Sequence, residues 1–217
     1  MIAGLRGQTV LLVVAFAPLA EALAECFRTF GAVVAAAGVE SFEGELEKLQ
    51  RDRRALDVLI QDAPHFPPVT CLDEYGGAPL WKAIEERNRP IFERLLRTRA
   101  ALGRFPRYVI ALSSPAPDRH QRGGDFTAAG EAMLETLCRY ASMRLDDENV
   151  CFNVLRHRLA FTGSALPARL IATPHDVANA AVALCSGWMD SMRGQVVTVD
   201  RGASFCDNPF RVLTEHT

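Results

Sequence analysis

Six short apolar runs recur along the chain, and each has the length of a strand rather than of a membrane span. The first, Thr9–Ala15, is apolar at nearly every position, which is typical of a strand covered on both faces of a sheet. Comparable runs lie at 32–37, 56–60, 108–112, 150–155 and 195–200. The pattern predicts six strands in the interior of the protein.

Helical spacing of apolar residues separates these runs. Between the first two, Leu19, Leu23 and Phe27 recur at helical intervals before Gly31. Further helices are predicted at 42–54, 79–102, 127–145 and 174–186. Strands that alternate with helices favour an α/β fold with a doubly wound, Rossmann-like parallel sheet. Because no repeat or linker interrupts this order, we predict a single domain over residues 1–217.

Charge and composition narrow the range of partners. The formal net charge is −2, which offers no basic surface for nucleic acid or for an anionic membrane. The N-terminal residues lack the layout of a signal peptide, and this favours a cytoplasmic protein. The six cysteines form no C-x-x-C pair and the five histidines show no ligand spacing, so we predict no metal site.

Several segments resemble the short-chain dehydrogenase/reductase family, and they occur in the family's order. Leu56–Pro64 is similar to its D-V-L-V-N-N-A-G segment, and Tyr108–Ser114 to the strand that ends in its catalytic serine. The other matching segments are 7–14, 153–162, 173–178 and 194–200. The resemblance covers nearly the whole chain and implies a Rossmann-like fold with NAD(P)-dependent oxidoreductase chemistry.

The catalytic positions that the resemblance implies are only partly retained. Ser114 is present, but Thr127 replaces the family's tyrosine and Glu131 its lysine. An aliphatic hydroxyl is too weakly acidic to donate a proton near neutral pH, and a carboxylate reverses the field that the lysine supplies. We therefore interpret Ser114 as a strand-end serine bonded to backbone and Thr127 as a helix N-cap. Glu131 is then a carboxylate near the start of that helix, favoured by the helix dipole.

The cofactor-binding positions of the family are altered as well. Its three phosphate-binding glycines are Val14, Pro18 and Ala20 here. Val14 adds a branched side chain at the turn, and Pro18 removes an amide donor from the helix start. His157 and Arg158 stand where the family has Pro-Gly beside the nicotinamide. We therefore expect no NAD(P) on this chain.

Two connections are shorter than the resemblance implies. Residues 38–56 leave room for one helix between the second and third predicted strands, but not for the family's additional strand, which carries the acidic residue beside the adenine. Residues 163–172 are too few for the helices that cover the substrate in typical members. The predicted fold is therefore truncated after its second strand and lacks the substrate lid.

These observations predict a catalytically inactive subunit that does not bind NAD(P) and assembles with an active paralogue or with itself. We expect the contacts to come from the Thr127–Leu145 helix and from the C-terminal helix–strand unit, with NAD(P) on the partner. A heterotetrameric dehydrogenase of the hydroxyacyl-CoA type is one example of such an assembly in the family.

Two other functions stay open at this point. The first is a divergent NAD(P)-dependent short-chain oxidoreductase that holds its cofactor in a non-standard pose. The second is a small-ligand sensor that uses the emptied cleft, with Asp62, Ser114, Glu131 and His157 meeting at the carboxyl ends of the strands.

Overall fold

A six-stranded parallel sheet forms the centre of the computed structural model, which describes residues 3–37, 41–62, 69, 72–118, 123–159 and 171–203. The strand order is β2-β1-β3-β4-β5-β6. The strands are β1 (Thr9–Val13), β2 (Val33–Ala37), β3 (Val58–Gln61), β4 (Tyr108–Ser113), β5 (Cys151–His157) and β6 (Val196–Val199). Every residue of β1, β3 and β4 is buried, as expected for strands with helices on both faces.

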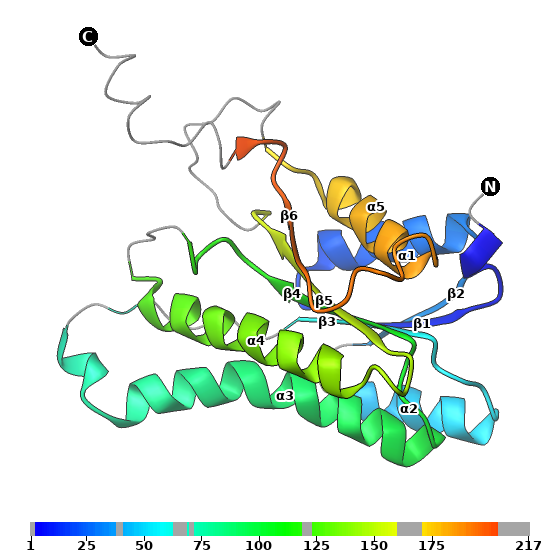
Figure 1. Ribbon diagram of the computed structural model, residues 1–217, viewed down its shortest axis with the longest axis horizontal. Coiled ribbons are helices and arrows are strands. Elements are labelled where there is room, and N and C mark those ends of the chain that lie inside the picture. The colour runs from blue at the N-terminus through cyan, green and yellow to red at the C-terminus, as the bar shows by residue number, and fades with distance from the viewer. Residues whose placement is uncertain are drawn as a thin grey trace, which may run out of the picture.

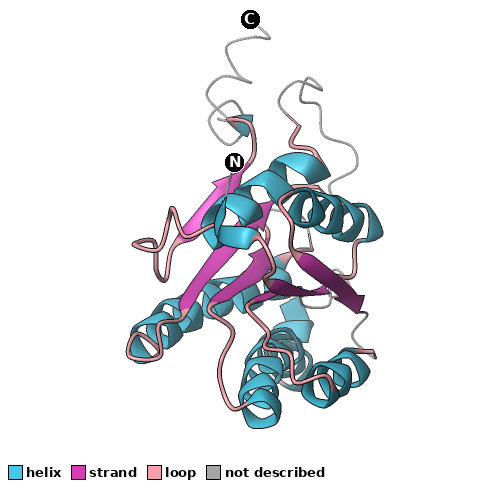
Figure 2. Ribbon diagram, turned by 90° about the vertical axis from the view of Figure 1, so that its right-hand side faces the viewer, coloured by secondary structure: helices cyan, strands magenta, loops and turns pink. Residues whose placement is uncertain are grey.

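Five helices cover the two faces of the sheet (Figures 1 and 2). Helices α1 (Ala17–Thr29) and α5 (Pro174–Cys185) lie on one face and share its apolar core. Helices α2 (Phe42–Arg51), α3 (Ala78–Leu102) and α4 (Asp125–Arg144) lie on the other. Two short 3-10 helices, η1 (Ala3–Leu5) and η2 (Leu72–Tyr75), precede β1 and α3.

The helices form where apolar side chains recur on one side of the segment. In α1, Leu19, Leu23 and Phe27 have no exposed surface, because they pack between the sheet and α5. Helix α3 ends at Gly103, whose φ of 75° is a left-handed conformation that glycine adopts without strain. The predicted strands and helices are all confirmed, with ends that shift by a few residues.

One predicted helix end is wrong. Helix α4 begins at Asp125, and its N-cap residue is Gly124. The amide of Ala128 already donates to the Gly124 carbonyl at 2.8 Å, so Thr127 lies inside the first turn and does not cap the helix.

The sheet is truncated, as predicted. In the part of the chain that the structure describes, α2 is the only element between β2 and β3, and β2 is left at the edge of the sheet. The predicted absence of a lid concerns residues 163–172, most of which lie outside the described residues. No helix among the described residues is both long and apolar enough to cross a bilayer.

Candidate functional site

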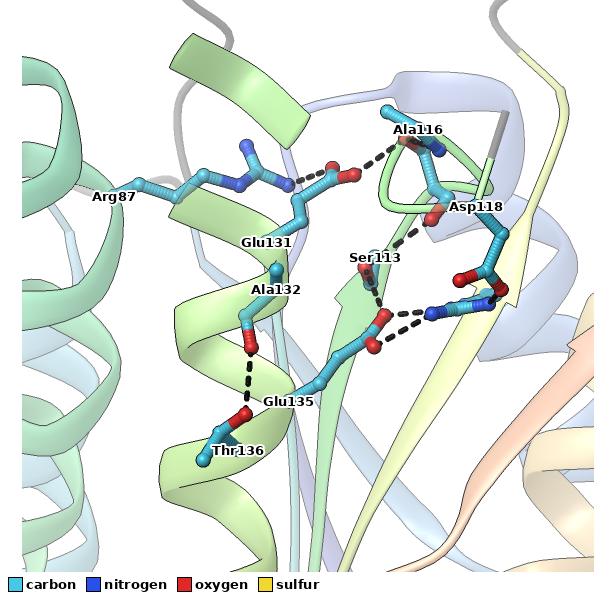
Figure 3. A network of polar contacts seen from close by, with 10 residues as sticks. Arg87, Ser113, Ala116, Asp118, Glu131, Ala132, Glu135 and Thr136 are labelled. Carbon is cyan, nitrogen blue, oxygen red and sulfur yellow. Dashed lines mark hydrogen bonds and ion pairs between the residues drawn. The ribbon is translucent and has the colours of Figure 1, made fainter. Parts of the chain in front are cut away.

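The side chain of Ser114 lies at the carboxyl end of β4, where doubly wound folds place their ligand sites. Its hydroxyl donates to Glu131 Oε2 at 2.6 Å and accepts the backbone N–H of Ala116 at 3.2 Å (Figure 3). Ser114 is 7% exposed. The predicted bond to backbone is thus present, but the stronger contact is a charge-assisted one to a carboxylate of α4.

Glu131 is fully buried and forms an ion pair with Arg87 of α3, with 2.5 Å between Oε1 and Nη2. Gly130 makes this contact possible, because a Cβ at position 130 would lie 3.2 Å from Arg87 Cδ. Glu131 lies near the start of α4, as expected, and Arg87 compensates its charge in addition to the helix dipole. Its two oxygens bind Arg87 and Ser114, and a buried carboxylate requires such partners.

A second ion pair lies one turn further along α4. Glu135 receives two hydrogen bonds of 2.6 Å from Arg156 of β5, and one of 3.2 Å from the Ser113 hydroxyl. Arg156 also forms an ion pair with Asp118, in the turn that follows β4 (Figure 3). These hydrogen bonds raise the pKa of Arg156, although burial opposes them. The two pairs join α3, α4, β4 and β5 at one end of the sheet.

Buried polar groups continue along α3 towards β3. Arg94 donates to the Asp62 carbonyl at 3.1 Å, and burial lowers its pKa while the charge of Asp62 opposes that shift. The side-chain amide of Asn88 donates to the Gly130 carbonyl at 3.2 Å. The surface between α3, α4 and the carboxyl half of the sheet is thus polar, which is uncommon for a helix that packs on a sheet.

The other residues of the predicted site lie at the same edge of the sheet. Thr127 is half-buried on α4, one turn before Glu131. Asp62 follows β3 directly, and His157 is the last residue of β5. The predicted cluster consists of Asp62, Ser114, Glu131 and His157. Within it, the structure shows a hydrogen bond between Ser114 and Glu131.

The predicted cofactor-binding residues lie at the end of β1, at the start of α1 and at the end of β5. Val14 follows β1 and is 9% exposed, while Pro18 and Ala20 belong to the first turn of α1. The N-cap residue, Phe16, makes no side-chain cap, and its carbonyl receives the amides of Leu19 and Ala20 at 3.0 Å. Arg158 follows β5 and is half-buried with His157.

Sequence reasoning missed Arg87, Arg94, Glu135 and Arg156, and a signal for the first three was present. Arg87 and Arg94 lie on the same side of their helix as the apolar residues Ile91 and Leu95. Glu135 likewise lies on the same side of its helix as Leu134 and Cys138. A charged residue on the apolar side of a helix is rarely buried unless it is paired. The spacing therefore indicates buried ion pairs, although it does not identify the partners.

Comparison with known proteins connects this fold with reductases. No protein-family model matches the sequence, and no curated protein does. Enoyl-[acyl-carrier-protein] reductase (NADH) from Aquifex aeolicus VF5 superposes with a TM-score of 0.71 at 19% identity, covering 91% of this chain and 96% of that one. FabI from Candidatus Liberibacter asiaticus superposes with a TM-score of 0.73 at 17% identity, covering 94% and 98%.

A third solved structure contains the cofactor. The enoyl-(acyl-carrier-protein) reductase from Anaplasma phagocytophilum, in complex with NAD, gives a TM-score of 0.73 at 16% identity and covers 94% of this chain and 96% of that one. These neighbours support a Rossmann-like fold.

The same neighbours contradict two predictions. We expected an inactive subunit with no NAD(P) of its own, yet the similar structures are named as reductases, one of them as an NADH enzyme and another as an NAD complex. The altered residues at positions 14, 18, 127 and 131 leave the fold unchanged, since it matches these structures over 91–94% of the chain. Both predictions are therefore wrong.

Proposed function

We propose that this chain is a divergent NAD(H)-dependent oxidoreductase of the short-chain type, with altered residues at the family's motif positions. One observation carries the proposal: the fold matches an NADH reductase over 91% of this chain and a reductase in complex with NAD over 94%. A fold supports several functions, so the site has to supply the rest of the argument.

The crevice outside β1 and β3 is where the dinucleotide would lie, because the strand order reverses there. Helix α1 points its N-terminus towards this crevice, and no side chain caps it. Pro18 has no N–H, and the amides of Leu19 and Ala20 are bonded to Phe16, so fewer donors face a phosphate than in a glycine-rich turn. The residues fit a dinucleotide in a shifted pose, with weaker phosphate contacts.

The chemical step rests on the contact between Ser114 and Glu131. A serine oxygen has two lone pairs, and Ala116 uses one, so the other can accept the hydroxyl of an alcohol substrate. Ser114 is a relay here and not the acid: as the alcohol gives its proton to the Ser114 oxygen, the Ser114 proton moves to the Glu131 carboxylate over 2.6 Å. The bound cofactor supplies the hydride acceptor. Reduction of a carbonyl or an enoyl thioester uses the same proton path in reverse.

Calorimetric titration of the purified full chain with NADH and NADPH tests the proposal. We expect NADH to bind in the micromolar range and to be oxidised when a ketone or an enoyl thioester is added. In the opposite direction, an alcohol should reduce NAD⁺. Ser114→Ala should abolish turnover and leave NADH binding intact. Thr136→Ala removes a hydroxyl from the exposed side of α4, the helix that carries Glu131, and is the matched control that should change neither. Failure of both dinucleotides to bind at millimolar concentration would overturn the proposal.

A further inference from the structure

Strand β2 forms one edge of the sheet, and its outer side has no neighbouring strand among the described residues. It pairs with β1 in parallel, with Val33 beside Thr9 and Ala37 beside Val13. The amide of Val33 donates to the Gln8 carbonyl at 2.8 Å. Backbone groups of alternate residues in a parallel strand point to opposite sides, so Val34 and Ala36 direct theirs away from β1.

These outward groups have one recorded contact in the described part of the chain. Arg28 Nη2 lies 3.4 Å from the Val34 carbonyl, which is long for a hydrogen bond, and the contact is solvent-exposed. The remaining groups are the two outward amides and the Ala36 carbonyl. An edge of this kind is a ready template for another strand.

The sequence does not protect the edge in the usual ways. Proteins block edge strands with charged side chains, proline or bulges. Residues 30–39 read FGAVVAAAGV, with neither a charge nor a proline, and β2 is paired with β1 along its whole length. Val33 is 40% exposed although it is β-branched and apolar. An unprotected edge of this kind indicates that something pairs with it.

We propose that β2 pairs antiparallel with β2 of a second copy of this chain, which joins two sheets into one continuous sheet. The two outward residues lie symmetrically about Ala35. A two-fold axis at Ala35 therefore places Val34 opposite Ala36 of the second copy, and Ala36 opposite its Val34. Both are hydrogen-bonded pairs, so all four outward groups of each copy gain a partner.

The charge pattern favours a second copy over an unrelated partner. A two-fold axis places each residue near its own counterpart, and like charges that face each other across a strand pair are destabilising. Segment 30–39 carries no charge of its own and its centre is made of small alanines, so the charge at this edge comes from Arg28, whose 3.4 Å contact with the Val34 carbonyl the second strand would replace. A different partner would normally be selected by complementary charge, which this strand does not offer.

Backbone hydrogen exchange together with molar mass tests the pairing. Light scattering and sedimentation of the full chain should show a dimer that dissociates on dilution. In the dimer, the amides of Val34 and Ala36 should exchange at least tenfold more slowly than at dilutions where the chain is monomeric. Ala35, whose amide faces β1, should be protected in both states.

Ala36→Pro removes an outward N–H without touching the bonds to β1, and edge strands accept proline there. We expect it to weaken the dimer at least tenfold while the circular dichroism spectrum is kept. Ala36→Ser retains the N–H and should dimerise normally. A chain that is monomeric at all concentrations would overturn the proposal. So would a dimer in which the Val34 and Ala36 amides exchange freely, since its contact would then lie elsewhere.

Discussion

Glu131 forms an ion pair with Arg87 in the interior of the protein. It is 0% exposed, and Arg87 is 1% exposed. Removing one member of a buried ion pair leaves the other charge without compensation, which costs about 3–5 kcal/mol. We therefore expect Glu131→Gln to lower the free energy of unfolding by about that amount in urea denaturation.

Two controls separate burial from charge alone. Glu148→Gln removes the exposed partner of Arg99, 3.1 Å away, and should cost at most about 0.5 kcal/mol. Adding Arg87→Met to Glu131→Gln removes the uncompensated charge and should recover most of the loss. Equal effects of Glu131→Gln and Glu148→Gln would show that the buried pair is not structurally important.

Asp176 is the residue whose charge sets a pH dependence. Burial raises the pKa of this carboxyl, but hydrogen bonds from Arg201 and Thr173 outweigh burial and lower it from 3.8 to about 2. A lowered carboxyl pKa gives stability that is complete above the unfolded-state pKa and lost as pH falls through the folded-state pKa. Asp176 is part of the capping box of α5, so its loss also removes a cap.

We expect Asp176→Asn to cost about 1 kcal/mol of unfolding free energy near neutral pH, after allowance for solvent screening. The difference from the natural chain should shrink as pH falls below about 4, because the carboxylate is protonated first in the unfolded state and then, through about pH 2, in the folded state. Urea denaturation of both proteins at several pH values measures this difference in unfolding free energy. A difference that stays constant over this range would contradict the assigned pKa.

At the scale of elements, Gly130 shows how closely α3 and α4 approach each other. Alanine in a helix interior is normally better than glycine by about 0.5–1 kcal/mol. At position 130 the new Cβ would lie 3.2 Å from Arg87 Cδ, and the Glu131 contact holds that side chain in place. We expect Gly130→Ala to give no gain in unfolding free energy, and a shift of Arg87 would turn the result into a loss.

Gly44 of α2 provides the matched comparison. A Cβ there meets no atom within 4 Å, so Gly44→Ala should stabilise the chain by about 0.5–1 kcal/mol. Thermal and urea denaturation of the two variants measure both effects. If the two substitutions were equally stabilising, the close approach of Arg87 to α4 would be wrong.

The elements themselves were predictable because each depends on local pattern. The Thr9–Ala15 run and the spacing of Leu19, Leu23 and Phe27 already require a buried strand followed by a helix. The ion pairs were not predictable in the same way. Arg87 and Glu131 are 44 positions apart, and their contact depends on how α3 packs against α4. The spacing marks such residues as buried, but tertiary packing selects the partner.

At the scale of the whole molecule, the helix that we expected to contact a partner, α4, turns one apolar side to the interior and another to the surface. Leu134 is fully buried, and Ala141 and Leu145 pack against the same apolar core, so this side of the helix serves the interior. The exposed apolar residues of α4 are instead Met133, Tyr140 and Met143. Assembly through α4 stays a prediction, and it would have to use this outer side.

The proposed dinucleotide site makes a prediction for the start of α1. Pro18 withholds one amide donor from the end of the helix that faces the crevice, whereas alanine at this position would supply it. One added hydrogen bond to a charged phosphate is worth about 1.5–3 kcal/mol at most, so we expect Pro18→Ala to tighten NADH binding by about tenfold. Pro79→Ala changes the equivalent first turn of α3, which lies on the other face of the sheet from α1, and should leave the affinity unchanged. Calorimetric titration measures both variants beside the natural chain. If Pro18→Ala binds NADH no more tightly than Pro79→Ala, the phosphates do not lie at the start of α1, and the cofactor has to be placed elsewhere along the carboxyl edge of the sheet.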